Sequence, residues 1–130
     1  MCSLAAFCQD GQTVPVHCLI VDDSQEFLDA ATRLLEAQGL TVVGRSRTGA
    51  DALELVDALA PDVVLVDVEL GDEDGIGVAG RLAAHPASPT VILISSHDRQ
   101  ALRELVPSDS GLGFLTKQDL TAEAITRLLS

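Results

Sequence analysis

The chain has 130 residues, 47% of them hydrophobic, and a net charge of −12. This length and hydrophobic content favour one domain around one core and argue against disorder. The strong acidity argues against direct nucleic-acid binding by this segment, and no apolar run approaches the ~20 residues that a membrane span needs. The N-terminus has no signal-peptide pattern, and the three cysteines fit neither a zinc pattern nor a closed disulfide framework, so we expect a cytoplasmic protein.

Residues 1–15 are expected to form a flexible extension, because Gln, Asp, Gly and Pro interrupt any regular pattern there. The domain proper is expected to cover residues 16–130. From residue 16 onward, short aliphatic runs alternate with longer segments. The runs are nearly continuous, as is typical of strands buried on both faces of a parallel sheet. Strands are therefore predicted at 16–21, 40–45, 63–67, 90–95 and 112–115.

The segments between these runs carry apolar residues at spacings of three and four, which indicates helices. In the first of them, Phe27, Ala31, Leu34 and Leu35 are expected to share one face, with Ser24 as the N-cap. Helices are predicted at 25–38, 49–60, 75–84, 98–106 and 119–129. Five βα units with short connections predict an α/β fold, with a doubly wound parallel sheet covered by helices on both faces.

Polar side chains occur where several of the predicted strands end. Asp22 and Asp23 follow the first strand, Asp67 ends the third, Ser95 ends the fourth, and Lys117, the only lysine, follows the fifth. The carboxyl ends of neighbouring parallel strands meet at one crevice, where ligands bind. Crowded carboxylates repel one another unless a cation lies between them, and Mg²⁺ prefers such oxygen ligands. A magnesium site is therefore expected at this edge of the sheet.

The same set of side chains suits phosphoryl transfer. Asp67 is the expected nucleophile, while the metal and Lys117 neutralise charge on the transferring oxygens. Ser95 is expected to donate a hydrogen bond to one of those oxygens. In the polar, glycine-bearing loop 68–75, the backbone carbonyl of Glu69 is expected to complete the metal site.

Five sequence elements, taken in order, resemble the receiver domain of bacterial two-component response regulators. They are Asp22-Asp23, Asp67, Asp74-Gly75, Ser95-Ser96 and the run Phe114-Leu115-Thr116-Lys117. The resemblance covers about residues 16–130 and implies the flavodoxin-like strand order 2-1-3-4-5. It also implies a signalling protein rather than an enzyme, which takes a phosphoryl group from a sensor histidine kinase and loses it by autodephosphorylation.

The resemblance implies a role for each site residue. Asp67 is similar to the phosphoacceptor, Asp23 to the direct Mg²⁺ ligand, and Asp22 to a ligand that acts mainly through water. Lys117 is similar to the lysine that pairs with the phosphate.

Further roles follow from the same resemblance. Ser95 and Phe114 are similar to the switch pair, in which the aromatic ring moves inward when the hydroxyl turns toward the phosphoryl group. Glu69 and His97 occupy rim positions that tune the hydrolysis of the acyl phosphate, although plain exposure explains both residues equally well.

Two positions depart from the common receiver pattern. Many receivers have a cis proline directly after the lysine, whereas Gln118 follows Lys117 here. Because a cis non-proline bond costs ~3 kcal/mol, a trans bond is predicted. Many receivers also have a proline in the loop after the phosphoacceptor, where this chain has Gly71.

One branch of the family is favoured by the sequence. The missing proline after the lysine and the run Thr41-Val42-Val43-Gly44 resemble the branch with a helix-turn-helix DNA-binding output. We therefore expect regulation of transcription through an output domain absent from this chain, with a homodimer or an effector domain as partner.

Other interpretations remain open at this point. The main alternative is a phosphohydrolase with an aspartyl-phosphate intermediate, built on Asp67 and Glu69, although such enzymes usually place the nucleophile after the first strand. A flavin- or cobalamin-binding module on the same fold is a third interpretation. The chain has no aromatic pair to stack a flavin and no histidine loop that fits cobalamin. Asp22-Asp23 also fits an ordinary acidic helix N-terminus, and Asp72-Glu73-Asp74 fits a solvated loop.

Overall fold

A computed structural model describes residues 7–9, 12–14, 16–96, 100, 104 and 112–129 of the chain. Within these residues, five parallel strands form one sheet in the order β4-β3-β5-β8-β9. The strands are β3 (His17–Val21), β4 (Thr41–Ser46), β5 (Val63–Asp67), β8 (Thr90–Ser95) and β9 (Gly113–Thr116). Counted along the chain, the order is 2-1-3-4-5, so the predicted α/β fold is confirmed. Each strand also lies within one residue of its predicted bounds.

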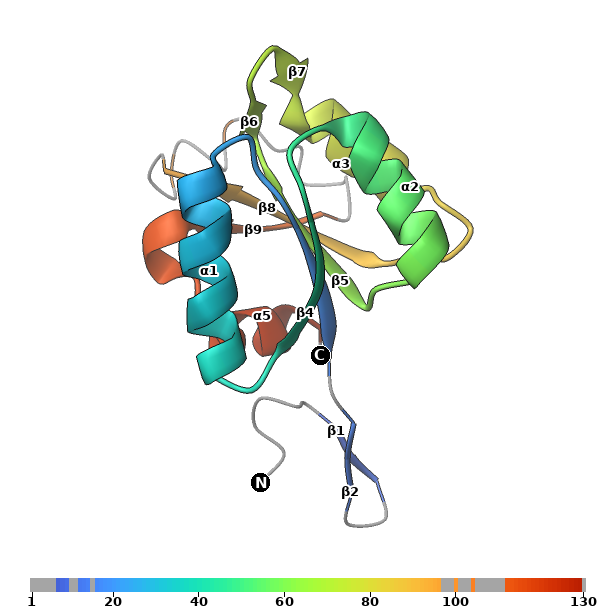
Figure 1. Ribbon diagram of the computed structural model, residues 1–130, viewed down its shortest axis with the longest axis vertical. Helices are drawn as coiled ribbons and strands as arrows, with labels where there is room; N and C mark the ends of the chain where they lie inside the picture. Colours follow the sequence, from blue (N-terminus) through green and yellow to red (C-terminus); the bar gives the residue numbers. More distant parts are fainter. Residues whose placement is uncertain are drawn as a thin grey trace.

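Helices cover both faces of the sheet (Figure 1). One pair lies on one side and a second pair on the other, as the right-handed connections of a doubly wound sheet require. The first pair is α1 (Gln25–Ala37) and α5 (Ala122–Leu129), and the second is α2 (Gly49–Leu59) and α3 (Gly75–Ala83). The helix predicted at 98–106 lies largely outside the described residues. Among those residues, no helix is long and apolar enough to cross a membrane.

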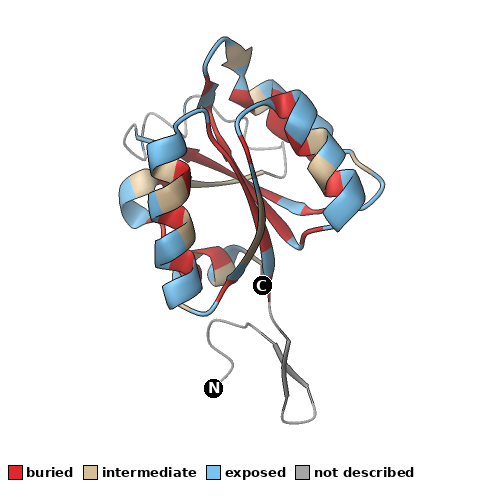
Figure 2. Cartoon of the chain, in the orientation of Figure 1, coloured by how far each residue is buried: buried red, intermediate tan, exposed pale blue. Residues whose placement is uncertain are grey.

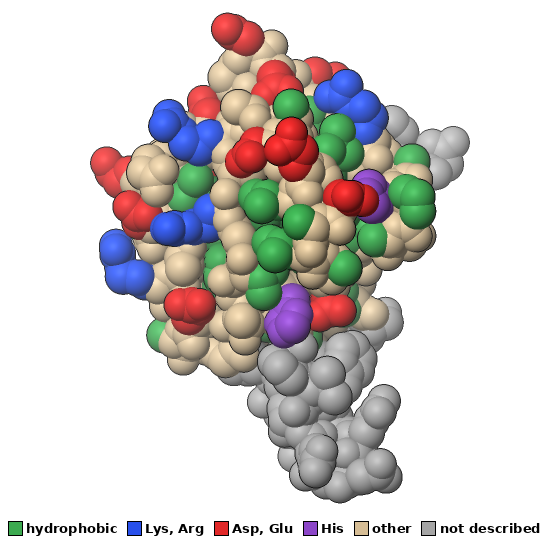
Figure 3. All heavy atoms as spheres, turned by 45° about the vertical axis from the view of Figure 1, so that its right-hand side comes forward, with side chains coloured by type: hydrophobic (Ala, Val, Ile, Leu, Met, Phe, Trp, Pro, Cys, Tyr) green, Lys and Arg blue, Asp and Glu red, His purple; other side chains and the backbone are tan. Residues whose placement is uncertain are grey.

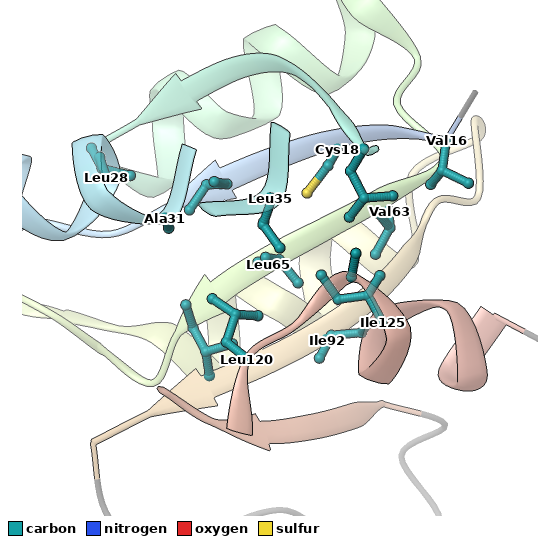
Figure 4. Close-up of a cluster of buried hydrophobic side chains, with 14 residues drawn as sticks. Val16, Cys18, Leu28, Ala31, Leu35, Val63, Leu65, Ile92, Leu120 and Ile125 are labelled. Carbon is teal, nitrogen blue, oxygen red and sulfur yellow. The ribbon is translucent and has the colours of Figure 1, made fainter. Parts of the chain in front are cut away.

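Successive side chains of each strand enter opposite cores, because strand side chains alternate between the two faces. In β3, Cys18 and Ile20 pack under α1 and α5, whereas Leu19 and Val21 pack under α2 and α3. Figure 4 shows the first of these clusters, and Figure 2 shows buried residues along the strands and on the inner faces of the helices. Each fully buried aliphatic side chain contributes about 1.5–3 kcal/mol. Burial of the aliphatic runs therefore stabilises the sheet and, with it, the positions of the strand ends.

The buried face of α1 differs from the predicted one. Leu28, Ala31 and Leu35 are buried, but Leu34 is 41% exposed. Leu34 precedes Leu35 by one position, about 100° around the helix, so with Leu35 fully buried Leu34 lies at the edge of the buried face. Ser24 caps the helix as predicted, since its side chain accepts a hydrogen bond from the backbone N–H of Phe27.

The last helix begins later than predicted. A 3₁₀ turn, η1 (Lys117–Asp119), comes first, because the Thr116 hydroxyl accepts a hydrogen bond from the Asp119 N–H at 3.1 Å. The Thr121 hydroxyl then accepts from the Ala124 N–H at 3.0 Å, so α5 begins at Ala122 and not at residue 119. The peptide bond between Lys117 and Gln118 is trans, as predicted.

Two short antiparallel pairs are absent from the sequence-based prediction. In the segment expected to be a flexible extension, β1 (Phe7–Gln9) pairs with β2 (Gln12–Val14). In the segment expected to be a loop, β6 (Glu69–Leu70) pairs with β7 (Glu73–Asp74). Gly71 makes the turn of the second pair at a φ of 59°, a conformation that glycine adopts without strain.

Figure 3 shows the face of the molecule that carries α2 and α3. Acidic side chains are spread over it, and basic side chains lie along the left side of the view and at its upper right. No continuous basic patch crosses the described part of this face, and such a patch is the usual footprint of a nucleic-acid backbone.

Candidate functional site

The site residues come from the carboxyl ends of four neighbouring strands. Val21 of β3 pairs with Val66 of β5, so Asp22 and Asp67 follow at the same level of the sheet. Asp67 in turn lies beside β8, which ends at the buried Ser95. Lys117 follows β9 directly, at the first position of the 3₁₀ turn. Topology alone therefore brings together groups that are up to 95 positions apart in the chain.

Three carboxylates form a compact cluster at this edge. One carboxylate oxygen each from Asp22, Asp23 and Asp67 lies within 4.8 Å of the other two. Asp22 and Asp67 are buried, whereas Asp23 is exposed. A cluster of this kind, closed on the protein side and open on the other, suits a hard cation that keeps some of its water.

The environment of Asp67 disfavours its charged form. Burial raises its pKa to about 6, and the negative charge of Asp22 adds to this, against the lowering effects of the Glu69 N–H and of Lys117. A divalent cation would relieve the repulsion between the carboxylates. The donor set and its electrostatics therefore fit Mg²⁺.

Lys117 places its ammonium group between two of the acids. Its Nζ lies 2.7 Å from Asp22 Oδ2 and 3.2 Å from Asp67 Oδ2. Burial lowers the pKa of Lys117, but the hydrogen bond to Asp22 and the charges of both carboxylates outweigh it, so the pKa lies above its ordinary value. Lys117 therefore stays charged at neutral pH and neutralises part of the acidic cluster.

Local hydrogen bonds hold the remaining carboxylate oxygens. Asp67 Oδ1 accepts from the Glu69 N–H at 3.0 Å, while its Oδ2 faces Lys117. Asp22 Oδ1 accepts from the Ser24 N–H at 2.8 Å, in a turn that leads into α1. Each of the two buried acids therefore has one oxygen held by its own loop and the other directed at the ammonium group.

Gly75 is required by the backbone beside Asp67. A Cβ atom at this position would lie 1.9 Å from the Asp67 carbonyl oxygen and 2.7 Å from two backbone atoms of Val68. The Gly75 N–H also donates to the Val68 carbonyl at 3.1 Å. The glycine of the Asp74-Gly75 element therefore allows the start of α3 to pack against the backbone of the predicted phosphoacceptor.

The acidic run after Asp67 is more than a solvated loop. Glu73 Oε1 accepts from the Gly49 N–H at 2.9 Å and so ties β7 to the N-terminus of α2. Asp74 caps α3, accepting from the Ile76 N–H at 3.1 Å. Asp72 is an exposed residue of the turn between β6 and β7.

The other predicted site residues lie near the cluster or outside the described part of the chain. Phe114 is half-buried on β9 and packs against the core under α2 and α3. Glu69 is exposed, and its backbone N–H donates a hydrogen bond to the Asp67 carboxylate. The metal-binding role of its carbonyl stays a prediction. His97 lies outside the described residues.

Phe27 is a site residue that the sequence-based prediction missed. Its ring centroid lies 4.1 Å from Lys117 Nζ. Its helical spacing predicts only that Phe27 lies on the apolar face of the helix, and no sequence motif predicts a contact with Lys117. The available signal is its position, on the first turn of the helix that follows the acidic pair.

Comparison with known proteins agrees with this geometry. The family model described as "Response regulator receiver domain" matches residues 18–129. The chain is 34% identical over 119 residues to the "Probable transcriptional regulatory protein NarL" of Mycobacterium tuberculosis, covering 91% of this chain and 55% of that protein. It is 37% identical over 115 residues to "Protein-glutamate methylesterase/protein-glutamine glutaminase 5" of Myxococcus xanthus, covering 88% of this chain and 33% of that protein.

A solved structure gives the same result. The signal receiver domain of the putative response regulator NarL from Mycobacterium tuberculosis superposes with a TM-score of 0.72 at 34% identity, covering 88% of this chain and 94% of that one. The chain thus spans about half or less of the two curated relatives named above but nearly all of an isolated receiver domain.

Proposed function

Because this chain belongs to the response regulator receiver domain family, we propose that Asp67 accepts a phosphoryl group from a sensor histidine kinase and that the modification switches a partner surface. The observation that carries the proposal is the Lys117 ammonium, at 2.7 Å from Asp22 and 3.2 Å from Asp67. A partly buried cation between two buried acids is costly to assemble unless its charge is used.

In the proposed reaction, an Asp67 carboxylate oxygen forms a bond to phosphorus while the N–P bond of the kinase's phosphohistidine breaks. The electron pair of that bond returns to the imidazole. Burial raises the pKa of Asp67 in the absence of metal, and the charges of Lys117 and of a bound Mg²⁺ would favour the ionised carboxylate that attacks phosphorus. Lys117 stabilises the negative charge on the transferring oxygens.

We propose that Asp22, Asp23 and Asp67 hold Mg²⁺, with the backbone carbonyl of Glu69 completing the set. The oxygens of the three carboxylates lie within 4.8 Å of one another, which supports this assignment. Bound Mg²⁺ would supply charge neutralisation for the phosphoryl oxygens.

Ser95 and Phe114 are the proposed switch. Once Asp67 is phosphorylated, the Ser95 hydroxyl donates to a phosphoryl oxygen and the half-buried Phe114 ring moves inward. This shifts the population of the β9–α5 face, where a groove of about 630 Å³ is lined in part by Phe114. Glu69 and His97 are proposed to tune the lifetime of the acyl phosphate from the rim of the site.

For the output, we propose regulation of transcription through an effector domain, or through a homodimer, without direct nucleic-acid contact by this segment. One relative is named as a probable transcriptional regulatory protein, which supports this choice. We propose that residues 16–130 form the receiver domain and that residues 1–15 form an N-terminal extension. We further propose that the protein is cytoplasmic.

Intact-mass measurement tests the central assignment. The protein is incubated with acetyl phosphate and Mg²⁺, and one phosphoryl group is expected to be added to the wild type and to the control Asp57→Asn, whose side chain is 82% exposed on α2. Asp67→Asn is expected to gain none. A stable gain that survives Asp67→Asn would contradict the assignment, and turnover of a generic phosphate monoester would favour the phosphohydrolase.

A further inference from the structure

The Lys117 ammonium group has three close neighbours, two carboxylates and one aromatic ring. Asp22 and Asp67 lie at 2.7 and 3.2 Å, and the face of the Phe27 ring lies at 4.1 Å from Nζ to the ring centroid. An ammonium group has three donors. Two carboxylates are within reach of these donors, and the Phe27 ring is a third neighbour of the same ammonium group.

A cation at this distance from an aromatic face is attracted by the ring quadrupole. The contact also limits the access of water, since the Lys117 side chain is only 21% exposed. The ring therefore restricts the flexible lysine stem to positions from which the ammonium reaches Asp67.

The backbone holds Phe27 close to the acidic pair. Ser24 connects the two, because its N–H donates to Asp22 Oδ1 at 2.8 Å and its hydroxyl accepts from the Phe27 N–H at 3.2 Å. Leu28, the next residue, is buried and donates its N–H to the Ser24 carbonyl at 3.0 Å. The Phe27 ring and the Asp22 carboxylate, which both contact Lys117, thus belong to one hydrogen-bonded turn.

We propose that Phe27 is a positioning residue for phosphoryl transfer, whose ring holds the Lys117 ammonium beside Asp67. This inference rests on the proposed function of Asp67. When the transferring phosphoryl group draws the ammonium away from the carboxylates, the ring limits its motion and keeps it at the reacting oxygens. Removing the ring's π face while keeping apolar volume should therefore slow phosphorylation without unfolding the protein.

The single lysine makes the contact directly observable. Lysine labelled with ¹³C at Cε gives one side-chain signal, from Lys117. We expect its ε-protons to be shifted upfield by the ring in the wild type and in Phe27→Tyr, and to return toward ordinary values in Phe27→Leu. An ε-proton shift that is the same in Phe27→Leu and in the wild type would overturn the proposal.

The rate of phosphorylation by acetyl phosphate, at fixed Mg²⁺, tests the consequence. A cation–π contact of this kind is worth roughly two- to five-fold in rate, so Phe27→Leu is expected to be slower by that factor. Phe27→Tyr, which keeps the ring, and Leu34→Ala, on the exposed side of the same helix, are expected to match the wild type. Urea unfolding of each variant verifies that it is folded under the assay conditions.

The outcomes separate this role from the proposed function. If the wild type gains no phosphoryl group, both the proposed function and this role are refuted. A wild-type rate in Phe27→Leu, or equal slowing in Phe27→Tyr and Phe27→Leu, would refute the positioning role alone.

Discussion

Replacing Gly75 by alanine is expected to destabilise the fold through the backbone of Asp67. The added Cβ would lie 1.9 Å from the Asp67 carbonyl oxygen and 2.7 Å from the Cα and carbonyl carbon of Val68. Unbonded carbon atoms are normally about 3.5–4.0 Å apart. These neighbours are backbone atoms in a close-packed core, so they cannot rotate away as a side-chain tip does.

The size of the effect follows from these contacts. Overpacking of a close-packed core costs about 1–3 kcal/mol, and a clash with backbone falls at or above the upper end of that range. Relief of the clash requires the start of α3 to move away from Val68, which would also break the 3.1 Å hydrogen bond from the backbone N–H of residue 75 to the Val68 carbonyl and add about 1 kcal/mol. We expect Gly75→Ala to lower the free energy of unfolding by about 3 kcal/mol or more.

Gly80→Ala is the matched control, because it makes the same chemical change in the same helix. A Cβ at Gly80 meets no atom within 4 Å, and helix propensity alone should stabilise this variant by about 0.5–1 kcal/mol. Urea denaturation of the two variants beside the wild type measures both effects. If Gly75→Ala were as stable as Gly80→Ala, the close approach of α3 to Asp67 would be refuted.

Two further predictions concern buried titratable groups. Burial and the charge of Asp22 raise the pKa of Asp67 from 3.8 to about 6, so stability present below pH 3.8 is lost as the pH rises through about 6. In Mg²⁺-free buffer, Asp67→Asn should therefore be more stable than the wild type at pH 7, by a margin that shrinks toward pH 4 in urea titrations; a margin independent of pH would contradict this. Burial raises the pKa of Cys18 to about 12, so peptide mapping should find Cys18 unmodified by iodoacetamide at pH 8 until urea is added. Rapid modification in the folded protein would contradict its place in the core.

The sheet could be predicted because its strands are long aliphatic runs that are buried on both faces. Such runs form strands because both of their faces are buried, and a nearly continuous hydrophobic sequence predicts this burial. In β6 and β7, backbone pairing around the φ of 59° at Gly71 decides the structure instead. These strands have two residues each, too few for an alternating pattern, so the hairpin could not be predicted from side chains.

The sequence predicts the start of α5 at residue 119, three residues before its actual start at Ala122, for a different reason. Thr116 and Thr121 are both competent caps, and the spacing of apolar residues does not choose between them. The choice depends on the 3₁₀ turn between them. That turn begins at Lys117, whose ammonium group contacts Asp22. Asp22 is distant in sequence, so local sequence patterns do not include this contact.

The candidate site was predictable in outline because the carboxyl ends of all strands in a parallel sheet lie at the same edge, so residues that follow neighbouring strands come close together. Acids after the first and third strands and a lysine after the fifth must meet if those strands run together. The supporting contacts were not predictable, because each has an ordinary explanation in sequence. Phe27 fits a helical core face, and Glu73 fits a solvated loop.

The position of the only lysine has a practical consequence for proteolysis. A protease specific for lysine has one peptide bond to cut in this chain, between Lys117 and Gln118. That bond lies in the 3₁₀ turn, with the lysine side chain held by Asp22 and Asp67. Cleavage at a single bond would thus report how often the pocket opens, without any label or substitution.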